Sequence, residues 1–226
     1  KVLWDIPNKQ KIRVRVLTGE GKAFSAGGDL DWMKRMANLS YEENHKDAMK
    51  LAVMLKKLDR LPFPTIAAVN GAAFGGGVGL VSACDIAIGN EYAKFSLSEV
   101  RLGLIPATIS PYVVRTVGSR NARYLFMTSN LIFSEEAHHL GLLTHHTLNN
   151  NFDNLIEKNI ENILKGGPEA IKASKDLVFY VEDKKIDETV MTETAKRIAD
   201  ARATDEGKEG TNAFLNKIKP GWQKND

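Results

Sequence analysis

The sequence of 226 residues has one cysteine, Cys84, and no run of about eighteen consecutive apolar residues. A single cysteine excludes a disulfide framework, so we expect a reducing compartment, either a cytoplasm or a mitochondrial matrix. The missing apolar run gives no reason to expect a membrane-spanning helix. No signal-peptide pattern follows Lys1. Cys84 itself is expected to pack as a small apolar side chain.

The chain also lacks a strong excess of charge of one sign. It carries 31 lysines and arginines against 28 aspartates and glutamates, a net charge of +3, and these charges are spread along the chain. This balance argues against a nucleic-acid partner and is compatible with a small anionic ligand. Metal-ligand spacing is missing as well, so we predict no metal site. Four histidines are instead predicted to lie on the surface: His138, His139, His145 and His146.

Glycine, by contrast, is concentrated in two turns that each follow a predicted strand. An apolar strand over 65–69 leads to Gly75, Gly76 and Gly77, and a helical segment follows over 78–83. A strand over 13–17 precedes the other turn, which lies within residues 24–30. Glycine lets a backbone approach its ligand closely, and a helix N-terminus presents unpaired N–H groups. Such turns suit a phosphate or an oxyanion, although tight packing of helix on strand is an alternative.

Two carboxylates near these turns have different predicted uses. Asp29 stands at the start of a helix, where a carboxylate is favoured, so we interpret it as a helix-start residue. Glu99 is a candidate proton carrier, with a solvated carboxylate at a strand end as the alternative. Asp85 is interpreted as a structural residue that fixes a turn.

Two nucleotide-binding motifs are excluded by single positions. A phosphate-binding loop ending at Lys22 would need glycine at Val16 and serine or threonine at Ala23. A dinucleotide fingerprint beginning at Gly75 would need its third glycine at Leu80.

The remaining pattern predicts an α/β core, residues 1–150, followed by an all-helical region, residues 151–226. Ser40 and Glu43 form a capping box that starts a helix running to about Leu61, where prolines end it. Further strands are expected over 85–88, 93–95 and 142–148, and further helices over 110–118, 119–127, 134–141, 152–165, 168–181, 185–200 and 204–216.

Four motifs then occur in order: G-K-A-F-S-A-G-G-D-L, P-T-I-A-A-V-N-G-A-A-F-G-G-G, C-D-I-A-I and F-S-L-S-E-V-R-L-G-L-I-P. Their combination resembles the crotonase (enoyl-CoA hydratase/isomerase) superfamily from about Arg13 to the chain's end. The resemblance implies a spiral of ββα turns with a helical C-terminal region that forms trimers, often as a dimer of trimers. It also implies additional strand residues before the Lys1–Ile6 stretch. The subgroup it suggests is that of methylglutaconyl-CoA hydratases.

The resemblance assigns the two glycine turns to an acyl-CoA site. The N–H groups of Gly28 and Gly76 would hold the thioester oxygen, and Glu99 would handle the proton. Coenzyme A would be part of the substrate, with no other cofactor, and neither nucleic acid nor a membrane is expected as a partner. The substrate-binding residues implied are Lys22, Phe24, Ala26, Gly27, Gly75 and Trp32.

Several residues keep two interpretations. Trp32, Met33 and Met36 line the acyl pocket or pack in the core. Arg101 or Arg115 binds a distal carboxylate of a glutaconyl-type substrate or forms a surface salt bridge.

One position departs from the family pattern. Many hydratases of the family use two glutamates, and the first would fall at Gly79. The main hypothesis is therefore an enoyl-CoA hydratase that relies on Glu99, with a branched glutaconyl-CoA as the narrower hypothesis for its substrate. The alternatives are a 3-enoyl to 2-enoyl-CoA isomerase and a catalytically silent family member that acts as a binding protein.

Overall fold

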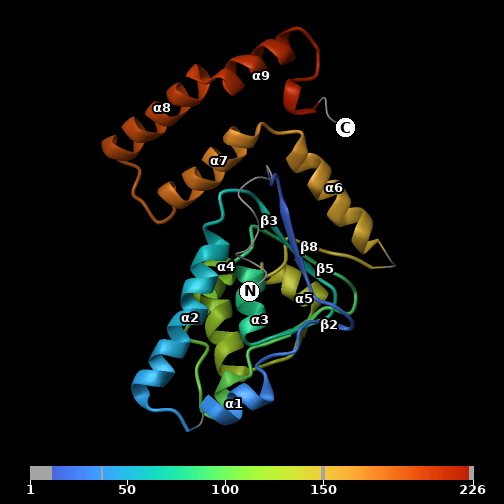
Figure 1. The fold of residues 1–226 in the computed structure, drawn as a ribbon, viewed down its shortest axis with the longest axis vertical. Helices are drawn as coiled ribbons and strands as arrows, with labels where there is room; N and C mark the ends of the chain where they lie inside the picture. Colours follow the sequence, from blue (N-terminus) through green and yellow to red (C-terminus); the bar gives the residue numbers. More distant parts are fainter. Residues whose placement is uncertain (1–11, 37, 149–150, 224–226) are drawn as a thin grey trace. The chain divides into compact units, whose positions relative to one another are not determined.

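The computed structural model describes residues 12–36, 38–148 and 151–223 (Figure 1). The Lys1–Ile6 stretch lies outside the described residues. The strands are β1 (Arg15–Thr18), β2 (Ala23–Ser25), β3 (Thr65–Val69), β4 (Ala72–Phe74), β5 (Ile86–Gly89), β6 (Lys94–Ser96), β7 (Ile132–Phe133) and β8 (His145–His146). The helices are α1 (Leu30–Met36), α2 (Tyr41–Asp59), α3 (Gly76–Ser82), α4 (Ser110–Thr128), α5 (Ser134–His139), α6 (Phe152–Leu164), α7 (Pro168–Val181), α8 (Glu188–Ala203) and α9 (Asp205–Leu215), with 3-10 turns η1 (Glu99–Leu102) and η2 (Gly221–Gln223).

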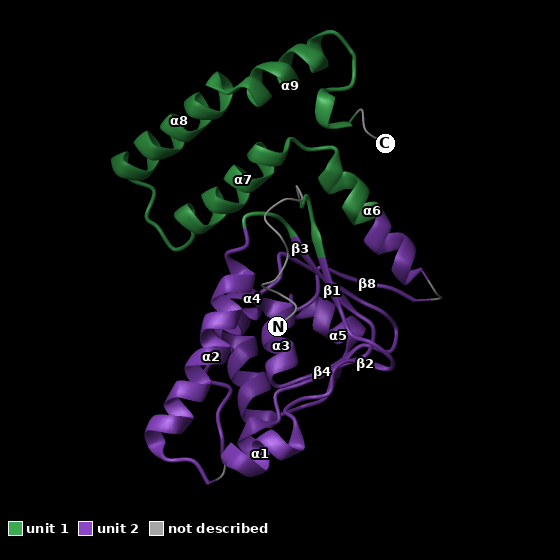
Figure 2. Cartoon of the chain, in the orientation of Figure 1, with its two compact units in different colours: residues 1–15, 62–64, 158–226 green, residues 16–61, 65–157 purple. Residues whose placement is uncertain are grey.

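The chain divides into two units, coloured in Figure 2. The core unit comprises residues 16–61 and 65–157. The helical unit comprises the segment up to Arg15, residues 62–64 and residues 158–226. No described helix is both long and apolar enough to cross a membrane.

Two four-stranded sheets organise the core unit. One has the order β1-β3-β5-β8 and the other the order β2-β4-β6-β7. Every residue of β3 is buried, as its continuous apolar sequence predicts for a strand covered on both faces. In the second sheet, β2, β4 and β6 run parallel, and β7 pairs with β6 in the antiparallel sense.

Local sequence signals explain where α2, a long helix of the core, begins. The N–H of Glu43 donates to Ser40 Oγ (3.2 Å), and the N–H of Ser40 donates to the Glu43 carboxylate (2.9 Å). This confirms the predicted capping box at the start of α2. The helix buries Leu55 and Leu58 against the core before the prolines that follow it.

The predicted break at Gly118 is confirmed, because this residue has non-helical backbone angles (φ 75°, ψ 160°) that kink α4 between its two helical segments. Two other predictions for the core need correction. The strand expected over 142–148 is reduced to the two residues of β8. Of the four histidines predicted to lie on the surface, only His139 is exposed. The His138 and His146 rings face each other at 5.2 Å between centroids because α5 packs on β8.

The helical unit is tied together by hydrogen bonds between distant segments. The Glu206 carboxylate on α9 accepts the N–H groups of Glu169 and Ala170 (3.0 and 2.8 Å) at the start of α7, where helical N–H groups lack intrahelical partners. The Trp222 indole donates to the Lys165 carbonyl (3.1 Å). These bonds attach the α6–α7 turn to α9 and to η2.

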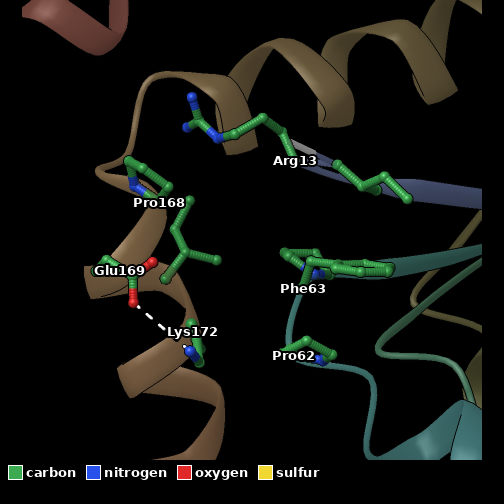
Figure 3. A pocket seen from close by; sticks show the side chains of 9 residues that line it. Arg13, Pro62, Phe63, Pro168, Glu169 and Lys172 are labelled. Atoms are coloured by element: carbon green, nitrogen blue, oxygen red, sulfur yellow. Dashed lines mark ion pairs between the residues drawn. The ribbon is translucent and has the colours of Figure 1, made fainter. Parts of the chain in front are cut away.

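A cavity of about 170 Å³ lies within this helical unit and is drawn in Figure 3. Its charged side chains already have partners. Arg13 donates to the carbonyls of Gly166 and Leu164 (2.6 and 3.4 Å), and Lys172 pairs with Glu169 (3.6 Å). The rest of the lining is mostly apolar: Ile12, Pro62, Phe63, Pro64, Pro168 and Ile171. Nothing in this lining points to a reaction.

Candidate active site

The candidate site lies at one edge of the second sheet, where three parallel strands end together. Ser25 of β2 pairs with Ala73 of β4, and Phe74 of β4 pairs with Ser96 of β6. Since the carboxyl ends of neighbouring parallel strands meet at the same edge, the residues that follow them are brought together. The first glycine turn follows β2, the second follows β4, and Glu99 follows β6. The three candidate features therefore share one edge.

Close contacts between the two glycine turns support this placement. A Cβ placed on Gly77 would lie only 2.7 Å from the Ser25 Cβ. A Cβ on Gly27, whose φ is 107°, would lie 3.9 Å from the Phe74 Cβ. Glycine is thus needed at residue 77 for close approach and at residue 27 for its backbone conformation.

The turn after β4 is held by a backbone hydrogen bond and leads directly into α3. The N–H of Gly75 donates to the Ser96 carbonyl (3.0 Å), and the Gly75 backbone has φ 49° and ψ −115°, which favours glycine. Helix α3 begins at Gly76, so this residue lies in the first turn, where main-chain N–H groups lack intrahelical partners. Apart from Gly76 itself, its chain neighbours and the nearby backbone of α3, no described atom lies within 4 Å of the position that a Cβ on Gly76 would occupy.

Glu99 places its carboxyl group against this turn. A Cβ on Gly75 would lie 3.1 Å from Glu99 Oε1. The other oxygen, Oε2, is buried and has no hydrogen-bond partner among the described residues. Burial raises the pKa of Glu99 because the ionised form loses solvation. A carboxyl that keeps its proton to higher pH is suited to acid–base chemistry, and the interpretation of Glu99 as a freely solvated carboxylate is wrong.

Helix α1 follows the first glycine turn. Asp29 Oδ1 accepts the N–H of Trp32 (2.7 Å), which confirms Asp29 as a helix-start residue. A Cβ on Gly28 would lie 3.3 Å from Trp32 Cζ3 and 3.5 Å from Met33 Sδ, so both side chains lie over this glycine. No residue of α1 is buried, and Trp32 is 37% exposed. Trp32 therefore does not pack in the core, whereas Met33 and Met36 are half-buried and keep both interpretations.

The segment before the first glycine turn is held by Asn70. The Asn70 side chain donates to the carbonyls of Gly19 and Gly21 (2.9 Å each) and accepts the N–H of Gly19 (3.2 Å). Lys22, Ala26 and Gly27 are exposed, whereas the Phe24 side chain is 9% exposed and packs in the core. Phe24 therefore offers a ligand mainly its backbone.

The space beside Gly79, where the family's other glutamate would lie, is occupied by a side chain from the start of α4. A Cβ on Gly79 would lie 2.8 Å from the Cβ of Ile109, which precedes α4 and is buried. A longer side chain at residue 79 cannot fit unless Ile109 moves. Neither Ile109 nor Asn70 is signalled as a site residue by the sequence, because their roles depend on segments distant in the chain.

The remaining candidates have structural partners. Asp85 Oδ2 accepts the N–H and the hydroxyl of Thr65 (2.8 Å each), which confirms its structural role. Arg115 forms an ion pair with Asp59, and Asp59 is only 4% exposed. The salt bridge of Arg115 is therefore partly buried, in contrast to the surface salt bridge that was predicted. Arg101 donates to the Ser129 carbonyl (3.1 Å). Among the described residues, no group of three or more His, Cys, Asp or Glu side chains is placed to hold a metal ion.

Comparisons with known proteins show which family has this sequence and fold. The family model described as enoyl-CoA hydratase/isomerase matches residues 1–225. The crystal structure of an enoyl-CoA hydratase from Shewanella pealeana has a TM-score of 0.91 at 42% identity, covering 95% of this chain and 80% of that one.

Two relatives are named for different reactions, one a hydratase and the other an isomerase. A short-chain-enoyl-CoA hydratase from Clostridium acetobutylicum is 31% identical over 220 residues, 96% of this chain and 83% of the relative. A mitochondrial Delta(3,5)-Delta(2,4)-dienoyl-CoA isomerase from Dictyostelium discoideum is 30% identical over 223 residues, 93% of this chain and 75% of the relative. The chain therefore belongs to the enoyl-CoA hydratase/isomerase family, as an enzyme with the α/β crotonase fold that its motifs predict.

Proposed function

We propose that this enzyme adds water across the double bond of a 2-enoyl-CoA thioester, with Glu99 as the group that moves protons. The observation that supports this most directly is the position of the Glu99 carboxyl. Its Oε1 lies against the turn that precedes Gly76, and its Oε2 is buried without a protein partner among the described residues. The N–H groups of Gly28 and Gly76 are the proposed donors to the thioester oxygen.

The proposed chemistry follows from where charge develops. Water attacks C3 of the substrate, and negative charge accumulates on the thioester oxygen. Donors fixed at that oxygen stabilise the charge, and one of them is commonly worth about 3 kcal/mol. Glu99 takes one proton from the water as the C3–O bond forms, and the same carboxyl returns a proton to C2. One carboxyl serving both carbons delivers both groups to the same face of the double bond.

The packing at Gly79 supports a site with one catalytic carboxyl. Ile109 occupies the space into which a side chain at residue 79 would extend. We therefore propose that Glu99 works with a water molecule and without a second glutamate. A single general acid–base group contributes roughly 10²- to 10⁴-fold, so hydration remains feasible.

The proposed contacts to the rest of the substrate come from the first glycine turn and its surroundings. Lys22 is exposed, and its ammonium group is suited to a phosphate of coenzyme A. Ala26, Gly27 and the Phe24 backbone are proposed to line the same segment, with Gly75 and Trp32 nearer the acyl group. Coenzyme A enters as part of the substrate, and we propose no further cofactor.

A branched glutaconyl-CoA is the narrower substrate that we propose. The motif resemblance to methylglutaconyl-CoA hydratases motivates it, because S-E-V-R-L-G-L-I-P continues with A-T-I-S-P. Such a substrate carries a distal carboxylate, for which Arg101, two residues after Glu99, is the candidate partner.

A screen of straight-chain and branched 2-enoyl-CoA thioesters tests this function. We expect hydration of at least one of them, with fastest turnover of the branched glutaconyl thioester. Turnover of straight-chain substrates alone would contradict the proposal of a branched glutaconyl-CoA substrate. Intact acyl-CoA binding without any turnover would favour the catalytically silent alternative.

The isomerase alternative is supported by the same apolar packing at Gly79, because moving one proton between C2 and C4 needs only one carboxyl. Incubation in water labelled with heavy oxygen separates the two reactions. The hydratase incorporates solvent oxygen into its product. A rearranged double bond without label would replace the hydratase proposal with the isomerase.

We also propose that the enzyme assembles as a homotrimer or a dimer of trimers through its helical region. Large apolar side chains near the end of this region are exposed in the single chain, among them Phe214, Leu215 and Ile218. Exposed apolar surface of this kind is typical of interfaces. Light scattering after gel filtration tests the proposal, and a monomer would contradict it.

A further inference from the structure

We propose that Asp47 is a positioning residue for the Gly28 amide, and that it acts through the indole of Trp32. Asp47 lies on α2, outside both glycine turns and outside the motifs that identify the family. The effect on turnover rests on the proposed function, whereas the effect on the backbone of α1 does not.

The connection from Asp47 to Gly28 has two steps. The indole Nε1–H of Trp32 donates to Asp47 Oδ2 at 2.9 Å. The six-membered ring of the same indole lies over Gly28, since a Cβ placed on that glycine would be 3.3 Å from Trp32 Cζ3. A rigid two-ring side chain thus links a carboxylate on α2 to the turn that carries the proposed oxyanion donor.

Helix α1 has few other means of holding its position. None of its residues is buried, and Leu30, its first residue, is 73% exposed. The Asp29 cap joins residues only three positions apart, so it stabilises the helix without attaching it to the core. The bond between Trp32 and Asp47 joins α1 to a different helix, 15 residues away in the sequence.

The Asp47 carboxylate is suited to this role. A hydrogen bond to an ionised group is stronger than a neutral one, and the indole bond lowers the pKa of Asp47. The carboxylate also has a second partner on its own helix, because Lys50 Nζ lies 3.3 Å from Oδ1. The two partners use different oxygens, so they can be removed separately.

The Gly28 amide must be held in place because its contribution depends on geometry. A main-chain donor stabilises developing charge only when it is aimed at the oxygen in advance. A displacement of about 1 Å at a catalytic group can cost roughly a hundredfold in rate. Loosening α1 is therefore expected to lower kcat more than it changes KM.

The test compares Asp47→Ala, which removes the acceptor, with Asp47→Asn, which keeps an oxygen in the same place. Lys50→Ala is the matched control, since it removes the other partner of Asp47 and leaves the indole bond. We expect Asp47→Ala to lower kcat about tenfold and Asp47→Asn to lower it about two- to threefold, because the Asn oxygen accepts the indole bond without a charge; Lys50→Ala should stay close to the original protein. In a Trp32→Phe background, Asp47→Ala should have almost no further effect.

Hydrogen exchange provides a readout that does not require turnover. Amides 28–36 should exchange faster in Asp47→Ala than in Lys50→Ala, while amides of β3 stay equally protected in both. Equal turnover and equal exchange in these two variants would overturn the proposal. So would an Asp47→Asn variant as impaired as Asp47→Ala. If the original protein turned over no enoyl-CoA, the proposed function would fail, and the exchange comparison would still decide the role of Asp47.

Discussion

The two glycine turns supply the same kind of backbone group but are held in different ways. The turn at Gly75–Gly77 leads into α3, most of which is buried, and packs directly against Ser25 and Glu99. The turn at Gly27–Gly28 leads into α1, which has no buried residue and is tied to α2 through Trp32. One proposed donor is thus fixed by the core, and the other by side chains at the surface. Substitutions in the turn at Gly75–Gly77 should therefore be more harmful than those in the turn at Gly27–Gly28.

Glu99→Gln should have the largest effect on turnover, because it removes the only proposed proton carrier at the core-fixed turn. We expect a loss of roughly a hundredfold or more, with acyl-CoA binding retained. The measurement is kcat on the best thioester, together with binding of a non-reactive acyl-CoA. An unchanged rate would remove Glu99 from the mechanism.

Gly75→Ala should lower turnover by up to about a hundredfold. The new Cβ would require a side chain at φ 49° and would press on Glu99 Oε1, so both the donor turn and the carboxyl would shift. Steady-state kinetics check this, and circular dichroism controls for folding. A folded variant with normal kcat would show that this turn is not as rigid as its packing indicates.

Gly28→Ala should lower kcat less than Gly75→Ala does, by about tenfold or below. Its Cβ would meet the Trp32 and Met33 side chains, which are not buried and can move by a few tenths of an ångström. Comparing kcat of this variant with that of Gly75→Ala measures the difference between the two turns directly. A greater loss at residue 28 than at residue 75 would reverse the comparison.

The smallest expected effect is that of Glu99→Gln on the pH dependence of the free energy of unfolding. Burial raises the pKa of Glu99 in the folded state, so this group favours folding at acidic pH and loses that contribution as pH rises through its raised pKa. The free energy of unfolding of Glu99→Gln, relative to the original protein, should therefore increase from about pH 5 to pH 8. Urea unfolding of both proteins across this range measures it. A difference independent of pH would mean that Glu99 is not desolvated in the folded protein.

Features that depend on neighbouring residues were predictable from the sequence. The capping box of Ser40 and Glu43 and the cap formed by Asp29 were predicted because each joins residues three positions apart. The long helices of the C-terminal region were also found close to their predicted ranges. The partial burial of His138 and His146 was missed because it depends on the packing of α5 against β8.

By itself, the sequence determined the family, the two glycine turns and the choice of Glu99 as the candidate proton carrier. Each of these depends on motif order or on the backbone preferences of consecutive residues. Only the tertiary structure decided that Ile109 fills the space beside Gly79 and that Asp47 reaches the indole of Trp32. Gly79 and Ile109 are 30 positions apart in the chain, and Trp32 and Asp47 are 15 apart. Contacts of this kind depend on how helices pack, which no local pattern specifies.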